Sequence, residues 1–194
     1  MRIPHHRIDV QDCHGANGGR AVIRPVLKST FERRDHRTHD QPDPSVDYRD
    51  HMIMWAKDVR RAIDYAEERP DLDAERLAYF GVSWGGRLGG LMVPVEPRFD
   101  AAVLYVAGLK FQRSLPEADP WNFLPRFTVP VLMLNGRYDN FFPLESSQKP
   151  MFEALGAAPE HKRHVVYDGG HFVPRAQLVR ETLDWLDRYL GKLP

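Results

Sequence analysis

The 194-residue chain contains a single cysteine, Cys13, so it cannot form a disulfide within itself. Stable disulfides are typical of oxidising compartments, and a chain without them suits a reducing one. No stretch approaches the roughly 18 consecutive apolar residues that a membrane span needs. The first residues, 1–7, also lack the apolar segment of a secretory signal. We therefore predict a cytoplasmic protein with no membrane partner.

The chain also lacks a surplus of charge of either sign, because 27 Lys and Arg residues balance 27 Asp and Glu residues. Nucleic-acid-binding domains usually carry a basic face, so this balance argues against a nucleic-acid partner. The sequence has no internal repeat and no low-complexity segment. Its length suits one domain with a sizeable core.

Short apolar runs alternate with amphipathic ones along most of the chain. The runs that predict strands are 20–27, 76–80, 99–108, 129–136 and 164–167. The segments with helical periodicity or composition are 45–69, 87–93, 144–155 and 175–190. This alternation predicts an α/β fold, with a mostly parallel sheet of about five strands and helices on both faces. Residues 1–19 are interpreted as irregular, and residues 20–194 as the α/β domain.

The most informative motif is Gly81-x-Ser83-x-Gly85, which lies between an apolar strand and a helix rich in small residues. In such a nucleophile elbow a serine occupies a strained strand-to-helix turn, and the glycines remove the Cβ atoms that would clash there. The backbone N–H of Trp84, at the helix N-terminus, would face a developing oxyanion. A glycine- and serine-containing turn without chemistry is the alternative interpretation of the pentapeptide alone.

Two further residues fit this motif. Asp139 and His171 each follow a predicted strand, and the carboxyl ends of parallel strands meet at one edge of a sheet. A serine hydroxyl needs an imidazole to take its proton, and a carboxylate to fix the imidazole tautomer. The order Ser, Asp, His is the order that α/β-hydrolases use. Asp168 and Asp119 are alternative acids, although Asp168 is very close to His171 in the sequence.

The chain from residue 20 onward resembles the carboxyl-terminal part of the α/β-hydrolase superfamily, of the dienelactone hydrolase and prolyl oligopeptidase (acylaminoacyl-peptidase) kind. The matching stretches are Leu77–Gly86, Val129–Asp139 and Gly169–His171, and Phe31–Arg34 with Tyr48–His51 resemble a bacterial hydrolase-like branch. The resemblance implies that Ser83 is the nucleophile, Asp139 the acid and His171 the base. It implies no metal and no organic cofactor.

The resemblance is incomplete at the amino terminus. Such folds have about three strands before the one predicted at 20–27, and the loop after the third supplies a second oxyanion donor. The segment His14–Gly19 resembles an oxyanion loop of the His-Gly-Gly-Gly type, but it leaves no room for the helix that should follow. We therefore expect an amino-terminally truncated version of the fold, with impaired activity.

Two segments have more than one interpretation. The charged loop 28–47 contains His36, His39, Asp40 and Asp43, a pattern that would suit a metal but also a solvated loop. The aromatic residues of segment 109–128 would either cap an apolar substrate pocket or close the edge of the sheet.

The sequence thus predicts a serine hydrolase that cleaves a carboxylic ester, or an amide, through an acyl-enzyme. The substrate would be a small-molecule ester or a short peptide, held beside Trp84, Tyr138, Phe141 and Phe142. A serine peptidase of the prolyl oligopeptidase kind and a non-catalytic hydrolase fragment are the alternatives. A homo-oligomer is compatible with the sequence.

Overall fold

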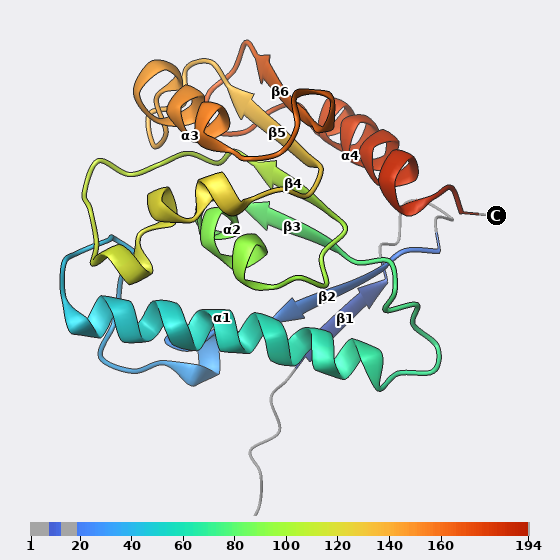
Figure 1. The fold of residues 1–194 in the computed structure, drawn as a ribbon, viewed down its shortest axis with the longest axis horizontal. Coiled ribbons are helices and arrows are strands. Elements are labelled where there is room, and N and C mark those ends of the chain that lie inside the picture. The colour runs from blue at the N-terminus through green and yellow to red at the C-terminus, as the bar shows by residue number, and fades with distance from the viewer. Residues whose placement is uncertain (1–7, 13–18, 194) are drawn as a thin grey trace, which may run out of the picture.

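The computed structural model describes residues 8–12 and 19–193, with side chains from residue 19 onward (Figure 1). Its main sheet is four-stranded and parallel, in the order β3-β4-β5-β6. The strands are β3 (Ala78–Val82), β4 (Ala101–Tyr105), β5 (Val131–Gly136) and β6 (Lys162–Tyr167). Both central strands, β4 and β5, are buried along their whole length. This accounts for their near-continuous apolar sequences, since a strand covered on both faces has no polar side.

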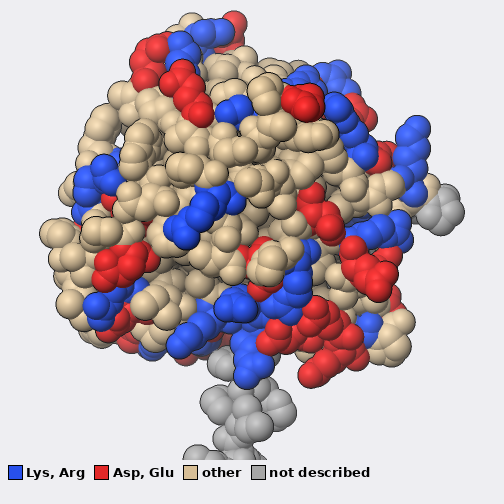
Figure 2. Space-filling model, in the orientation of Figure 1, with Lys and Arg blue, Asp and Glu red and all other residues tan. Residues whose placement is uncertain are grey.

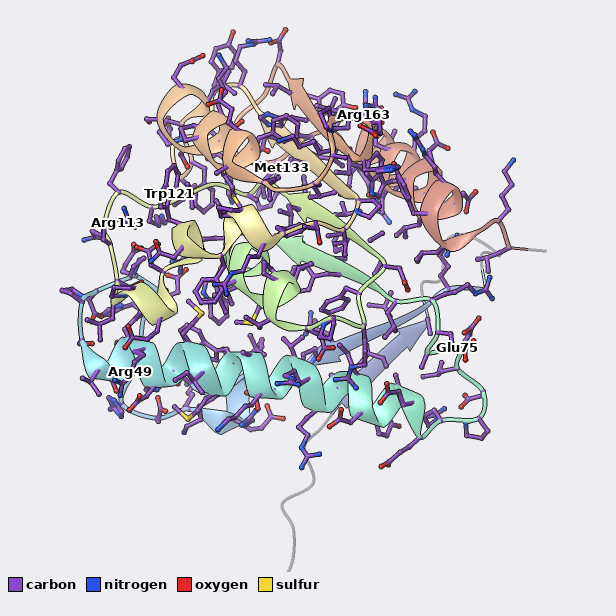
Figure 3. All side chains as sticks on the ribbon, viewed as in Figure 1. Arg49, Glu75, Arg113, Trp121, Met133 and Arg163 are labelled. Carbon is purple, nitrogen blue, oxygen red and sulfur yellow. The ribbon has the colours of Figure 1, made fainter. Side chains whose placement is uncertain are left out.

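Helices cover both faces of this sheet, as predicted. The helices are α1 (Val46–Glu67), α2 (Trp84–Val95), α3 (Lys149–Ala154) and α4 (Arg175–Leu190). On one face, Leu104 and Met133 pack in a core cluster with residues of α1, α2 and α3 (Figures 1 and 3). On the other face, Val103 and Leu132 pack against Trp185 of α4. The α/β architecture is therefore confirmed.

Helix α1 begins where Ser45 caps it, with the Ser45 hydroxyl accepting a hydrogen bond of 3.0 Å from the Tyr48 N–H. Its apolar stripe is buried, and Met52 and Trp55 are each 1% exposed. The Trp55 ring meets that of Trp84 edge to face at 5.0 Å between ring centres. Helix α1 therefore supports the start of α2, which carries the glycine-serine motif.

The amino-terminal part differs from the prediction. Strand β2 (Ala21–Pro25) does not join the main sheet but pairs antiparallel with β1 (Ile8–Asp12). The expectation of an irregular segment over 1–19 is thus wrong for residues 8–12, and the main sheet has four strands where about five were expected. The physical reason is that the ladder of β2 finds its backbone partners in β1. The segment His14–Gly19 falls almost wholly outside the described residues.

The segment 109–128 forms three short 3₁₀ turns, at Pro116–Ala118, Pro120–Asn122 and Leu124–Arg126. Leu124 and Phe127 are fully buried in the main core, whereas Trp121 is 40% exposed. Figure 3 shows Arg113 and Trp121 together on this segment. Part of the segment thus packs in the main core and part lines a surface hollow, and neither of the two interpretations considered above is established.

The visible surface carries both signs of charge, intermixed, and the basic side chains gather mostly beside acidic ones (Figure 2). Within the described residues, none of the helices combines the length and the apolar character needed to cross a bilayer.

Candidate active site

Ser83 occupies the turn between β3 and α2, with φ 52° and ψ −105°. A non-glycine residue in this region of φ and ψ is strained, and it persists only when its surroundings fix it. The Ser83 N–H donates to the Tyr105 carbonyl at 2.9 Å, and the Ser83 carbonyl accepts from Arg87 N at 2.9 Å. At Gly81 a Cβ atom would lie 2.4 Å from the Gly85 oxygen, so only glycine fits there. The local sequence thus imposes the geometry of a nucleophile elbow.

The side chain of Tyr79 stabilises this turn. Its hydroxyl donates a hydrogen bond of 2.6 Å to the Gly85 carbonyl. Burial raises the pKa of Tyr79 above its usual range, so the hydroxyl keeps its proton and remains a donor.

The structure brings Ser83, Asp139 and His171 together from three loops at the carboxyl edge of the sheet. His171 Nε2 lies 2.9 Å from Ser83 Oγ, and His171 Nδ1 lies 2.8 Å from Asp139 Oδ2. Both contacts have the length of a good hydrogen bond. The imidazole is 14% exposed and the Asp139 carboxylate is fully buried. A single imidazole therefore bridges a strained serine hydroxyl and a buried carboxylate.

The Asp139 carboxylate is held by its own loop. Its second oxygen, Oδ1, accepts hydrogen bonds from the N–H groups of Phe141 at 2.8 Å and Phe142 at 3.1 Å. These donors compensate a buried negative charge and leave Oδ2 free to face His171.

The two alternative acids do not approach His171. The Asp168 side chain is 78% exposed and forms an ion pair with Arg137 at 2.8 Å. Asp119 forms an ion pair with Arg113 and accepts a hydrogen bond from the Trp121 N–H at 3.1 Å. Of the three candidate carboxylates, the structure places Asp139 against the imidazole.

Sequence reasoning missed Gln148, which clamps the Asp139 loop. Its side chain is fully buried, and its Nε2 donates to the carbonyls of Gly136 at 2.9 Å and Phe142 at 2.7 Å. These carbonyls lie on either side of Asp139 in the sequence. Gln148 ends a π-helical turn, Leu144–Gln148, and such turns are frequent at functional sites. The only sign of this role in the sequence is that Gln148 is a polar residue in the predicted helix 144–155.

Tyr105 was also missed as a contact of the His171 loop. Its hydroxyl accepts a hydrogen bond from Val173 N at 3.1 Å. Tyr105 is 5% exposed and ends β4, next to the β3 strand that leads to Ser83. It therefore ties the histidine loop to the sheet.

The predicted aromatic residues take different places. Phe141, 64% exposed, and the buried Phe142 lie 4.8 Å and 6.2 Å from His171 between ring centres. The Trp84 ring packs on Trp55 instead, so its backbone rather than its side chain faces the elbow. Tyr138 is 66% exposed, with its N–H bonded to the Gly169 carbonyl at 2.9 Å.

Phe172 is an exposed aromatic ring that the prediction omitted. It is 65% exposed and lies 4.9 Å from the His171 ring. Its position directly after His171 was the signal available in the sequence. With Phe141, it gives the imidazole an apolar border on the solvent side.

A cavity of about 210 Å³ lies along the segment 109–128, and none of Ser83, Asp139 and His171 lines it. Its lining includes Arg87, Leu109, Lys110 and Trp121. The Lys110 ammonium lies 4.9 Å from the ring centre of Phe142, which connects the cavity to the aromatic residues around His171.

The metal-ligand pattern of loop 28–47 is not assembled as the sequence suggested. The Asp40 backbone carbonyl accepts a hydrogen bond from Arg87 at 2.7 Å, and Asp43 pairs with Arg37 at 3.2 Å. His36 lies instead against Asp47 and His51 of α1. Among the residues that the structure describes, these three form a group that could hold a metal ion.

Comparison with known proteins identifies a protein family that matches this chain. The model of the dienelactone hydrolase family matches residues 33–174. A protein of Escherichia coli O157:H7 named as a carboxymethylenebutenolidase is 31% identical over 156 residues, covering 74% of this chain and 53% of its own. This chain thus spans about half the length of the curated relatives that it matches.

Solved structures agree with the fold. A crystal structure described as a dienelactone hydrolase from Klebsiella pneumoniae is 26% identical, with a TM-score of 0.62, over 71% of this chain and 62% of that one. An esterase from an Arctic intertidal metagenomic library is 23% identical, with a TM-score of 0.60, over 75% and 65% of the two chains. The latter likeness supports the fold alone.

Proposed function

The chain belongs to the dienelactone hydrolase family, and we propose on this basis that it is a serine hydrolase that cleaves a carboxylic ester through an acyl-enzyme. In this proposal Ser83 is the nucleophile, His171 the general base and Asp139 the acid that orients it. The substrate is a small-molecule ester, and the curated relatives named as carboxymethylenebutenolidases point to the same class of bond.

One observation carries the proposal: His171 lies within hydrogen-bonding distance of Ser83 Oγ on one side and of Asp139 Oδ2 on the other, at 2.9 and 2.8 Å. A serine hydroxyl alone is a weak nucleophile near neutral pH, and this arrangement supplies the base that it needs. The strained φ of Ser83 supports the assignment, because such strain concentrates at functional sites.

The reaction follows from these positions. Ser83 Oγ attacks the ester carbonyl while His171 Nε2 takes its proton, and the buried Asp139 carboxylate stabilises the imidazolium through Nδ1. The Trp84 N–H, at the N-terminus of α2, stabilises the tetrahedral oxyanion. His171 returns the proton to the leaving alcohol. Water, activated by the same imidazole, then attacks the acyl-serine and releases the acid.

The exposed rings around His171 favour an ester with a moderately apolar acyl group. Phe141 and Phe172 lie within 5 Å of the imidazole between ring centres, at 4.8 and 4.9 Å. An apolar acyl chain against these rings would lose water-exposed surface on both sides. Because this border offers apolar contact, we propose an ester with an apolar acyl group in preference to a peptide.

A fluorophosphonate probe tests the nucleophile. We expect it to label the native protein at Ser83, and the label to disappear in Ser83→Ala and after heat unfolding. Ser146→Ala, which removes an exposed serine, is the matched control and should label normally. Hydrolysis of p-nitrophenyl esters of increasing acyl length then tests the substrate class. Labelling that persists in Ser83→Ala, or native protein that neither labels nor turns over any ester, would refute the proposal.

A further inference from the structure

A second cluster of chemically active side chains lies in the charged loop 28–47 and the first turns of α1, apart from Ser83 and its partners. It contains His36, Asp47 and His51, whose potential ligand atoms all lie within 4.8 Å of one another. We propose that these three residues bind a zinc ion, with His36 and His51 as nitrogen ligands and Asp47 as the oxygen ligand. The site is independent of the proposed esterase activity.

The spacing of two ligands already suits the ion. Asp47 and His51 are four residues apart on α1, so they project from the same face of the helix. His51 Nδ1 lies 3.3 Å from Asp47 Oδ1. Two ligands bound to zinc at about 2.0–2.1 Å in a tetrahedral arrangement are about 3.3 Å apart.

The third ligand is free to adjust. His36 Nε2 lies 2.6 Å from Asp47 Oδ1, so it would need to move outward by less than 1 Å to share an ion with that oxygen (estimated from the same zinc distances). The His36 side chain is 71% exposed on an irregular loop, so little packing opposes this movement. Two imidazoles and one carboxylate form a ligand set that zinc prefers, with a water molecule to complete it.

The surroundings of His51 give an independent reason for a cation. The His51 side chain is 3% exposed, and oxygen atoms lie near both of its ring nitrogens. Nε2 is 3.1 Å from Asp35 Oδ2, and Nδ1 is 2.8 Å from the Asp47 carbonyl oxygen. A neutral imidazole has only one N–H, so one nitrogen must direct a lone pair at oxygen. If Nε2 donates to Asp35, the lone pair of Nδ1 faces the Asp47 carbonyl oxygen at 2.8 Å, so the imidazole must turn from that oxygen toward Asp47 Oδ1, 3.3 Å away, to bind the ion through Nδ1.

In this arrangement Asp35 does not bind the ion but accepts a hydrogen bond from its ligand His51. Histidines that bind metals usually donate their second N–H to a carboxylate or a carbonyl, which fixes the tautomer and the ring orientation. Asp35 lies on the far nitrogen of His51 from Asp47 and is itself held by Lys28 at 2.8 Å. The His51 imidazole would therefore lie between the Asp35 carboxylate on Nε2 and the proposed ion on Nδ1.

The local charge permits a divalent cation. Arg37 binds the other oxygen of Asp47, Oδ2, at 2.6 Å and leaves Oδ1 to the two histidines. Asp35, Asp43 and Asp47 contribute three negative charges, and Lys28 and Arg37 contribute two positive ones. One negative charge remains in excess, and zinc would reverse it to a single positive charge, part of which its water ligand could offset by losing a proton.

The site would connect a loop to the helix behind the active site. His36 belongs to the loop, whereas Asp47 and His51 belong to α1, whose Trp55 supports Trp84 at the start of α2. Zinc would therefore fix the loop against α1 and raise the stability of the fold, without contacting the ester.

The test uses the whole 194-residue chain after treatment with a chelator. Zinc is titrated by calorimetry, and Co²⁺ is used as a spectroscopic probe because a tetrahedral N/O site gives it intense visible absorption. The variants are His36→Ala and its matched control His39→Ala, which removes a histidine three residues away on the same loop. His36 is exposed, so its removal should not prevent folding.

We expect one zinc ion to bind the wild type and the His39→Ala variant, with the Co²⁺ absorption and a raised Tm. In His36→Ala the affinity for zinc should fall at least tenfold, because even the loss of a hydrogen-bond partner of a ligand lowers metal affinity by roughly 10- to 100-fold. The Co²⁺ band should disappear as well. Equal affinity in both variants would place the ion elsewhere and overturn the proposal. A wild type that binds no zinc would overturn it as well.

Discussion

Gln148→Leu is the substitution that most directly tests how the Asp139 loop is held. Leucine has a similar volume but no donor, so the carbonyls of Gly136 and Phe142 both lose the hydrogen bond from Gln148 Nε2. A buried polar group left without its partner costs about 1–3 kcal/mol, which gives a loss of about 2–6 kcal/mol for two. Gln148 Oε1 is itself buried without a partner within the described residues, so removing it returns part of that cost. We therefore expect the free energy of unfolding to fall by about 1–4 kcal/mol.

Gln148→Leu should also lower the rate of ester hydrolysis, through its effect on Phe142. The Phe142 carbonyl accepts from Gln148, and the Phe142 N–H donates to Asp139 Oδ1. If Phe142 shifts once its carbonyl has lost this bond, Asp139 loses a donor and its other oxygen moves relative to His171. Loss of the correct orientation of the imidazole costs up to about 10⁴ in kcat in the trypsin precedent. A partial displacement should lower kcat/KM by roughly 10- to 100-fold, on the same scale.

Gln148→Glu separates positioning from a general loss of stability. A buried ionised carboxylate would repel both carbonyls, whereas the protonated acid can donate one hydrogen bond. The ratio of kcat/KM for Gln148→Glu to that for Gln148→Leu should therefore rise as the pH falls.

Urea unfolding and ester turnover measure these effects, with the exposed Gln112→Leu as a control that should change neither. The reasoning fails if Gln148→Leu keeps kcat/KM within twofold of the wild type, or if the Glu-to-Leu ratio stays constant with pH.

Three further predictions concern single residues. Asp139→Asn should lower kcat by several powers of ten, whereas Asp168→Asn, on an exposed ion pair, should change it less than tenfold in steady-state assays; the reverse order would identify Asp168 as the acid. Ser83→Gly should be more stable than Ser83→Ala by roughly 1 kcal/mol, because glycine accepts φ 52° without strain, and equal unfolding midpoints would contradict this. Burial, together with Lys149, lowers the pKa of His164 from 6.5 to about 4, so the unfolded chain takes up this proton first as the pH falls. The wild type should therefore lose roughly 3 kcal/mol of stability between about pH 6.5 and pH 4 through this group, a loss that unfolding curves of His164→Gln should lack.

The sequence alone determined much of the architecture. The limits predicted for the last helix agree with α4, Arg175–Leu190, and the strands at 129–136 and 164–167 agree with β5 and β6 to within two residues. Helical and strand periodicities arise because one side of each segment is buried, and the apolar residues on that side recur at short, regular intervals along the sequence. The elbow was equally readable, because its glycines and serine satisfy a local backbone conformation.

Tertiary structure decided which distant residues meet. His171 and Ser83 are 88 residues apart, and Asp139 is 32 residues from His171. The sequence favoured Asp139 over Asp168 as the acid, but no local pattern shows that its carboxylate reaches the imidazole, or that Gln148 holds the loop around Asp139. The same holds for β2, whose apolar sequence shows that it is a strand but not that it pairs with β1. Periodicity records only whether a side chain is buried, whereas pairing and hydrogen bonding depend on positions that exist only once the chain has folded.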